Sequence, residues 1–288
     1  MTRGRAPSPV GRRGIVVLGI AAIGAWAWAR LGLDLDGLVP TEGGARIARR
    51  FFGAALSPAF DYEADVVGAA PPYLATIAEA LGRTAIYAAA ALALAFVPGV
   101  VLGVLASASF WGGDPATVDR RGLGRVVPRA VRATTRVLIA LSRSIHELLW
   151  AVVLLAAMGA SSATGVLALA LPLVGTLAKV FSELLDEAKD AGERGVRGTG
   201  VSPFGAFLWG RIPVALPDMA AYTFYRFECA FRSSAVLGFF GFPTIGYFLR
   251  ASFEENHYRE VWACLYGLLF VVVVLERWGA GLRRRFVT

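Results

Sequence analysis

Long apolar runs alternate with short basic segments along the whole chain. No charged residue occurs from Thr84 to Gly113 or from Leu148 to Ala178. Uninterrupted apolar runs of about 18 residues or more are typical of helices that cross a membrane. The pattern therefore predicts an all-α integral membrane protein rather than a soluble domain.

The same pattern predicts about six transmembrane helices in two regions. We place the spans at about residues 14–33, 84–110, 137–159, 166–185, 214–240 and 262–275. A turn at residues 161–165 precedes the fourth span, a short separate helix from Tyr73 precedes the second, and a turn and outer loop precede the last. The first span follows a basic segment, as a signal peptide would, but Trp26 and Trp28 suit an anchor at the membrane interface. Residues 1–72 are thus expected to form an N-terminal transmembrane helix and an external amphipathic segment, and residues 73–288 the core.

The charge distribution fits membrane topology better than nucleic-acid binding. The 288 residues carry a formal net charge of +8, but the arginines lie in short segments between the apolar runs. Arginine and lysine are most frequent near the N-terminus, in residues 111–136 and 186–211, and near the C-terminus. Because cytoplasmic loops are enriched in these residues, we expect both termini in the cytoplasm and no nucleic-acid partner.

A basic, glycine-rich segment at residues 186–211 separates two apolar runs. Ser202 and Pro203 suit the N-cap and first turn of a short helix. Helical spacing places Phe204, Phe207 and Leu208 on one face, and an exposed apolar face needs a surface to cover it. That surface is either the lipid headgroups, with the helix lying at the interface, or a partner protein into which the helix docks.

This segment resembles the cytoplasmic coupling loop of ABC-transporter permeases. The family pattern is EAA, three residues, glycine, nine residues, a hydrophobic residue, any residue, then Leu-Pro. Gly200 matches the motif glycine, and Ile212-Pro213 takes the Leu-Pro position. The pattern departs at Arg194-Gly195-Val196, which replace EAA with Glu193 one place early, and at Gly210, where a hydrophobic residue is usual.

Two further stretches are similar to the phosphonate-transport branch of these permeases. They are Ser142–Ala151 and the region around Tyr225-Arg226-Phe227-Glu228 and Arg232-Ser233. The resemblance implies a type I ABC importer permease fold with a cytoplasmic coupling helix and a coupling loop at about residues 186–213. It implies import of a small anionic solute, phosphonate or a related phosphorus oxyanion, across the bacterial inner membrane.

The resemblance also implies partners and contact residues. The expected partners are ATP-binding cassette ATPase subunits, a second permease copy (identical or a paralogue), an external solute-binding protein and the lipid bilayer. The residues implied to couple the chain to the ATPase are Glu193, Arg197, Gly200, Ser202, Pro203, Phe204 and Phe207.

The chain lacks the sequence signals of an ATPase or another enzyme. A phosphate-binding loop needs Gly-Lys-Ser/Thr, and the only lysines, Lys179 and Lys189, stand in other contexts. Cys229 and Cys264 lack metal-ligand spacing. We therefore expect no cofactor or metal bound by this chain, no enzymatic activity of its own, and ATP with magnesium in a separate subunit.

Ionisable residues inside predicted spans are candidates for a solute path. Arg226, Glu228 and Arg232 fall in the fifth span, where they either line a path that attracts an oxyanion or lock spans together. Ser233 and Ser234 would add hydroxyl groups to the path. In the third span, Arg143 and Glu147 have i, i+4 spacing and flank His146, which suits a structural clamp or a gate.

Two other interpretations stay open. The same architecture is also compatible with another small solute, such as an amino acid or an organic cation. A self-contained ion-coupled carrier or membrane enzyme would instead require buried acidic or histidine relays or a catalytic cluster, and the sequence shows neither.

Overall fold

The computed structural model describes residues 12–33, 37, 39–63, 71–112 and 123–286. Helices and the turns between them make up these residues, with no strand among them, which confirms the all-α fold. The chain divides into two units, residues 1–53 and 54–288. In the first, α1 (Arg12–Leu31) exposes large apolar side chains all round, as a lipid-facing helix does, and α2 (Glu42–Ala54) is amphipathic.

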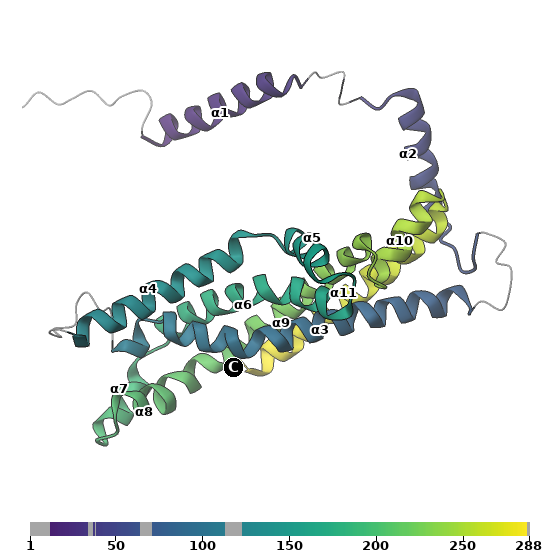
Figure 1. The fold of residues 1–288 in the computed structure, drawn as a ribbon. Coiled ribbons are helices and arrows are strands. Elements are labelled where there is room, and N and C mark those ends of the chain that lie inside the picture. Colours follow the sequence, from purple (N-terminus) through teal and green to yellow (C-terminus); the bar gives the residue numbers. More distant parts are fainter. Residues whose placement is uncertain (1–11, 34–36, 38, 64–70, 113–122, 287–288) are drawn as a thin grey trace, which may run out of the picture. The chain divides into compact units, whose positions relative to one another are not determined.

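The second unit is a helical bundle (Figure 1). Its helices are α3 (Tyr73–Ala106), α4 (Leu123–Ser144), α5 (Glu147–Met158), α6 (Ser162–Glu187), α7 (Ala191–Gly198), α8 (Pro203–Ala206), α9 (Ile212–Val236), α10 (Ile245–Glu254) and α11 (Tyr258–Phe286). A π-helical turn, Phe207–Arg211, joins α8 to α9. Helices α7 and α8 lie at the opposite end of the bundle from α10 (Figure 1).

Small residues allow α3 and α6 to pack closely at the centre of this bundle. A Cβ added at Gly99 would lie 2.9 Å from the Leu177 Cβ, and one added at Gly103 would lie 2.9 Å from the Phe181 Cβ. Ala88, Ala91 and Ala95 on α3 are fully buried. Such small-residue contacts are typical of helix packing in membranes, where close backbone approach strengthens van der Waals attraction.

The number of apolar helices agrees with the prediction, although two spans are bent. Four helices, α1, α3, α6 and α11, are long and apolar enough to cross a membrane on their own. The pairs α4–α5 and α9–α10 bend by 86° and 47°, and counting each pair as one span gives up to six within the described residues.

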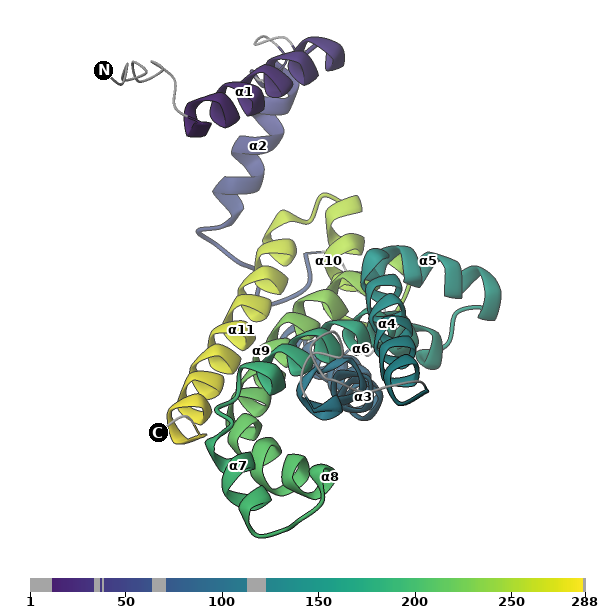
Figure 2. The ribbon, with the colours of Figure 1, turned by 90° about the vertical axis from the view of Figure 1, so that its left-hand side faces the viewer.

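The predicted span over residues 137–159 is not one continuous helix. Helix α4 ends at Ser144, and His146 is extended, with ψ of 146°, before α5 begins at Glu147. The Nδ1 atom of His146 accepts a hydrogen bond from the Leu148 N–H at 3.3 Å, so this side chain caps the new helix. Figure 2 shows α5 turning away from the end of α4. As a result, Arg143 and Glu147 are not one turn apart on a helix.

Two other predictions about the helices are also corrected. The expected separate helix at Tyr73 is continuous with the second span in α3, because Tyr73, Ile77 and Ala80 are buried in a cluster that includes Cys264 of α11. The expected turn and outer loop before the last span contains a helix, α10. Its first residue, Ile245, is buried and donates its N–H to the Thr84 hydroxyl at 3.0 Å, which fixes α10 against α3.

Candidate functional site

The segment from α7 to the start of α9 lies where α3 and α6 end. The hydroxyl of Ser202 accepts a hydrogen bond from the Gly205 N–H at 3.2 Å, and Pro203 is the first residue of α8. This confirms the predicted N-cap and first turn. Helix α8 has four residues and continues through the π-helical turn into α9, so the short helix is directly connected to a long one.

Gly200 allows the chain to turn between α7 and α8. Its φ angle is +85°, a left-handed conformation that favours glycine. A Cβ at this position would meet no described atom within 4 Å, so the requirement comes from backbone conformation rather than from space. The motif glycine identified in the sequence therefore has a physical reason in this structure.

The exposed apolar face of this segment differs from the one expected. Phe204 is 62% exposed and Trp209 is 71% exposed, whereas Phe207 is only 2% exposed. The prediction that Phe207 shares the exposed face is wrong. It lies in the π-helical turn, where α-helical spacing no longer holds, and its ring packs against Phe110 with centroids 5.4 Å apart. Phe204, Trp209 and the partly exposed Leu208 and Val201 form the exposed face.

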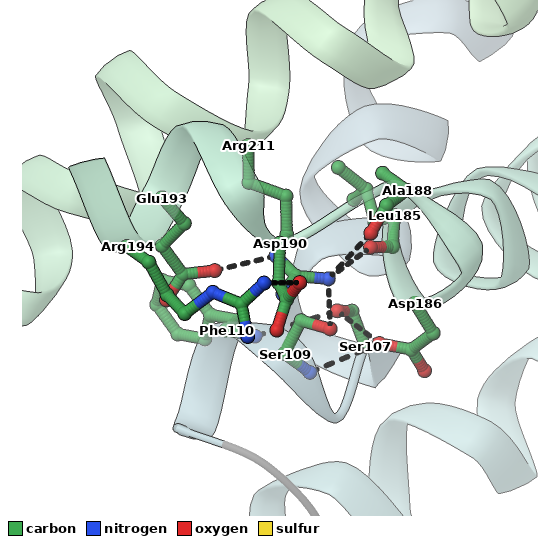
Figure 3. Close-up of polar contacts among 10 residues, drawn as sticks. All are labelled: Ser107, Ser109, Phe110, Leu185, Asp186, Ala188, Asp190, Glu193, Arg194 and Arg211. Atoms are coloured by element: carbon green, nitrogen blue, oxygen red, sulfur yellow. Dashed lines mark hydrogen bonds and ion pairs between the residues drawn. The ribbon is translucent and has the colours of Figure 1, made fainter. Parts of the chain in front are cut away.

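A buried ion pair connects α7 to Arg211, the last residue of the π-helical turn before α9 (Figure 3). The Arg211 Nε donates to the Glu193 carboxylate at 2.6 Å, and the two side chains are 10% and 11% exposed. The Arg211 Nη1 also donates to the Ser109 hydroxyl at 2.9 Å and to the carbonyls of Leu185 and Ala188 at 3.0 and 3.3 Å. The guanidinium of the π-helical turn thus joins that turn to α7, to the end of α6 and to the turn after α3.

A second carboxylate stabilises the turn after α3. Asp186 accepts hydrogen bonds from the Ser107 hydroxyl at 2.8 Å and from the Ala108 and Ser109 N–H groups at 3.1 and 2.9 Å. Because charge-assisted hydrogen bonds are stronger than neutral ones, this turn is held firmly to the end of α6. The two networks meet at Ser109 (Figure 3).

Two glycines let α7 contact the π-helical turn backbone to backbone. A Cβ added at Gly210 would lie 2.6 Å from the Glu193 Cα, and one added at Gly192 would lie 2.7 Å from the Gly210 carbonyl oxygen. A Cβ atom essentially never lies within 3.0 Å of another heavy atom outside its own neighbourhood, so no larger residue fits here without displacing α7. This explains why Gly210 stands where the family usually has a hydrophobic residue.

The charged residues of α7 have different environments. Glu193 is directed into the chain toward Arg211, whereas Arg197 is exposed. Arg194 forms an exposed ion pair with Asp190 at 3.0 Å. Sequence reasoning missed the roles of Arg211, Asp186 and Ser109, because partners that are 18 or 77 positions apart leave no periodic signal.

A second candidate site is a cavity of about 260 Å³ at the break between α4 and α5. Helices α6 and α9 form its other walls. Its polar lining residues are Arg143, His146, Glu147, Thr176, Arg226 and Ser233. The structure thus brings Arg226 and Ser233, proposed for a path, together with Arg143 and Glu147, proposed for a clamp or gate.

The polar groups of the cavity are only partly paired. The Ser233 hydroxyl donates to a Glu147 carboxylate oxygen at 2.6 Å, and the His146 Nε2 lies 3.8 Å from the same oxygen. The Nε of Arg226 is buried and has no hydrogen-bond partner among the residues that the structure describes. A buried donor without a partner is unusual and calls for a ligand, ion or water.

The remaining charged and hydroxyl residues of α9 point elsewhere. Glu228 and Arg232 form the expected i, i+4 ion pair at 2.8 Å, and neither lines this cavity. The prediction that Ser234 lies beside Ser233 on a path is wrong. Successive residues of a helix point about 100° apart. Ser234 is fully buried against α3, where its hydroxyl donates to the Thr84 carbonyl at 2.7 Å.

Comparisons with known proteins agree with the motifs. The family model described as "Binding-protein-dependent transport system inner membrane component" matches residues 121–286, more than half of the chain. The phosphite transport system permease protein PtxC of Stutzerimonas stutzeri is 34% identical over 156 residues, which cover 54% of this chain and 57% of that protein. The phosphate-import permease protein PhnE of Mycolicibacterium smegmatis is 35% identical over 156 residues, covering 54% and 29%. The chain thus matches little more than half of the first relative and less than a third of the second.

Solved structures show the same fold at low sequence identity. The chain resembles a chain of the MetNI methionine ABC transporter in an inward-facing conformation, with a TM-score of 0.61 and 17% identity, covering 75% of this chain and 99% of that one. It also resembles a chain of an amino acid ABC transporter, with a TM-score of 0.60 and 14% identity, covering 74% and 95%. These similarities concern the fold alone.

Proposed function

This chain belongs to the family of binding-protein-dependent transport system inner membrane components, and from that premise we propose that it is the membrane-spanning subunit of an ATP-driven importer of a small phosphorus oxyanion. Family and apolar helices together make it a multi-pass inner-membrane protein. The proposal depends mainly on the structure of the segment from α7 to α9. It presents an exposed apolar face on a folded, internally bonded base at the end of the bundle.

In this proposal, the exposed face docks into a separate ATPase subunit. Phe204 and Trp209 are large, exposed and carried by a backbone continuous with α9. Arg211 and Asp186 join the same region to α6 and to the turn after α3. A displacement of the docked face would therefore move the helices as one piece, which is how a binding event selects between two conformations. Glu193 contributes by holding Arg211 rather than by touching the ATPase.

The other partners and the topology follow from the same proposal. ATP and magnesium are held by the ATPase subunits, an external binding protein delivers the solute, and a second permease copy completes the path. Both termini lie in the cytoplasm together with the docking face. The family description, which refers to dependence on a binding protein, supports the external partner.

The substrate class is supported by the relatives and by the cavity. The two relatives above are named for phosphite and phosphate transport. Arg143 and Arg226 place two guanidinium groups around the cavity, and guanidinium geometry suits tetrahedral oxyanions. An amino acid or an organic cation, carried by the same architecture, is the second candidate that the sequence left open. If the chain were an ion-coupled carrier, the docking face would have no role.

The proposal is tested by placing a charge on the docking face. In the complete transporter, reconstituted with its ATPase and binding protein, Phe204→Asp is expected to abolish ATP-driven uptake of phosphite or phosphate and to weaken retention of the ATPase during purification. A matched control is Phe60→Asp, since Phe60 is 67% exposed and lies outside the docking face. Equal uptake and equal ATPase retention in the two variants would refute the docking role. Uptake of methionine but of neither oxyanion would refute the substrate class alone.

A further inference from the structure

The cavity at the α4–α5 break has an excess of positive charge inside the membrane-spanning helices. Two guanidinium groups, Arg143 and Arg226, and one carboxylate, Glu147, line it together with a histidine. Ionisable groups within a span normally face a charged partner or a water-filled space. Glu147 has a partner in Ser233, but the Arg226 Nε has none among the described residues. The charge balance and the unpaired donor both indicate an anionic ligand.

We propose that this cavity is a transient oxyanion-binding site within the permease. Arg143 and Arg226 bind the anion, and Glu147, held in place by Ser233, keeps its affinity low enough for release. The inference rests on the proposed function and extends it by naming the residues that contact the solute inside the chain.

The size and chemistry of the cavity suit a small oxyanion. Its volume of about 260 Å³ admits a small ion with several water molecules, since liquid water occupies about 30 Å³ per molecule. Guanidinium groups form paired, charge-assisted hydrogen bonds with phosphate-like oxygens. Leu169, Pro172 and Leu173 of α6 add an apolar part to the lining.

The break between α4 and α5 places Arg143 and Glu147 at the same cavity. Arg143 lies in the last turn of α4 and crosses α6 at Gly175, where an added Cβ would lie 2.8 Å from the Arg143 Cγ. The glycine thus leaves the space through which Arg143 reaches the cavity. Glu147 begins α5, and its carboxylate is fixed toward α9 by the 2.6 Å bond from Ser233.

Glu147 provides the negative charge that prevents tight binding. A site of two arginines alone would hold an oxyanion strongly and slow its passage. A fixed carboxylate in the same cavity repels the anion and competes with it for the guanidinium groups. Both effects lower the affinity of the cavity for the solute. Neutralising this carboxylate should therefore tighten binding and slow transport.

The site can be measured without relying on transport. A cysteine placed by Thr176→Cys, in the complete transporter with Cys229→Ser, reports on the cavity, because Thr176 lines it and the native Cys264 is fully buried. We expect a negatively charged thiol reagent to react faster than a positively charged one of similar size. The ratio of the reaction rate of the negative reagent to that of the positive reagent should fall about tenfold in Arg226→Gln. This is the effect expected from removing one nearby charge at intermediate dielectric. Phosphite or phosphate should slow the reaction of the negative reagent.

Matched controls and a second substitution complete the test. Arg83→Gln and Glu79→Gln remove the same charges from an exposed ion pair on α3 and should change neither the ratio nor the protection. Glu147→Gln should lower the oxyanion concentration that gives half protection by about tenfold, because one repelling charge is lost, and should slow maximal uptake. Tighter oxyanion binding together with slower uptake is not expected from a purely structural role.

Two outcomes separate this inference from the proposed function. If neither oxyanion protects the cysteine while the complete transporter still imports one of them, the cavity is not the site and the importer function stands. If the oxyanions protect the cysteine in an Arg226-dependent way but neither is imported, the binding site stands and the proposed substrate is wrong.

Discussion

Removing Arg211 should release α7 from the rest of the docking segment, which is the segment from α7 to the start of α9. In Arg211→Met, the Glu193 carboxylate would stay in a site where it is 11% exposed, with no positive partner. The carbonyls of Leu185 and Ala188 and the Ser109 hydroxyl would lose the donor that they share. The variant therefore tests whether one buried guanidinium organises the whole segment.

The size of the effect follows from the burial of the pair. Removing one partner of a buried ion pair costs about 3–5 kcal/mol, because the other charge remains without compensation. The segment can relieve this cost by opening locally, so the loss should appear as local rather than global unfolding. Since each 1.4 kcal/mol is about a factor of ten, the open population of α7 should rise at least about 100-fold.

Limited trypsin digestion measures this opening, because α7 contains exposed cleavage sites at Arg194 and Arg197. When opening and closing are fast, the cleavage rate follows the open population. The control Asp190→Asn breaks the exposed pair with Arg194, whose side chains are 72% and 53% exposed, and should raise the cleavage rate less than about fivefold, because exposed pairs contribute at most about 1 kcal/mol.

A double variant separates lost charge pairing from lost space filling. Arg211→Met combined with Glu193→Leu replaces both charges with apolar groups and should restore most of the resistance to trypsin, since paired replacement of a buried ion pair is often neutral. Cleavage of Arg211→Met at the wild-type rate would refute the reasoning.

Three other substitutions have defined expectations. Gly210→Ala should displace α7, since its Cβ would lie 2.6 Å from the Glu193 Cα, and lower ATP-driven uptake at unchanged expression; Gly195→Ala, with open space around it, should leave uptake unchanged. Ser202→Ala removes an N-cap and should destabilise the docking segment by about 1 kcal/mol, seen as faster trypsin cleavage. Gly103→Leu should separate α3 from α6 and reduce the yield of folded protein in detergent.

The sequence predicted the parts of this fold that depend on composition and local capping. Continuous apolar runs predicted the helices of the spans because each span satisfies its own backbone hydrogen bonds. The Ser202 cap and the Gly200 turn could be predicted because their causes, a side-chain acceptor and a left-handed backbone, act within a few residues. The types of these residues and of their near neighbours are therefore enough to predict the cap and the turn.

The bend at residue 145 and the shift at Phe207 could not be predicted in this way. Residues 137–159 are apolar enough for a continuous helix, and the break depends on His146 capping α5 and on the packing of both halves against α6. The π-helical turn that contains Phe207 packs closely against α7 at Gly210. Both features arise from contacts between elements.

The candidate sites were likewise predictable in part, because only their local features could be read from the sequence. Sequence spacing identified Arg143, Glu147, Arg226 and Ser233, but as two separate groups on different helices. Their meeting in one cavity required the three-dimensional arrangement. The Glu193–Arg211 pair, separated by 18 residues, gave no local signal.

We propose that this chain moves its solute only when a separate ATPase binds the segment from α7 to α9. Vesicles containing the chain with its ATPase and binding protein should accumulate phosphite or phosphate when ATP is supplied on the side of the membrane where the ATPase lies. Vesicles containing the chain without the ATPase should accumulate neither, with or without an ion gradient. Accumulation by the chain alone under a proton or sodium gradient would contradict the account.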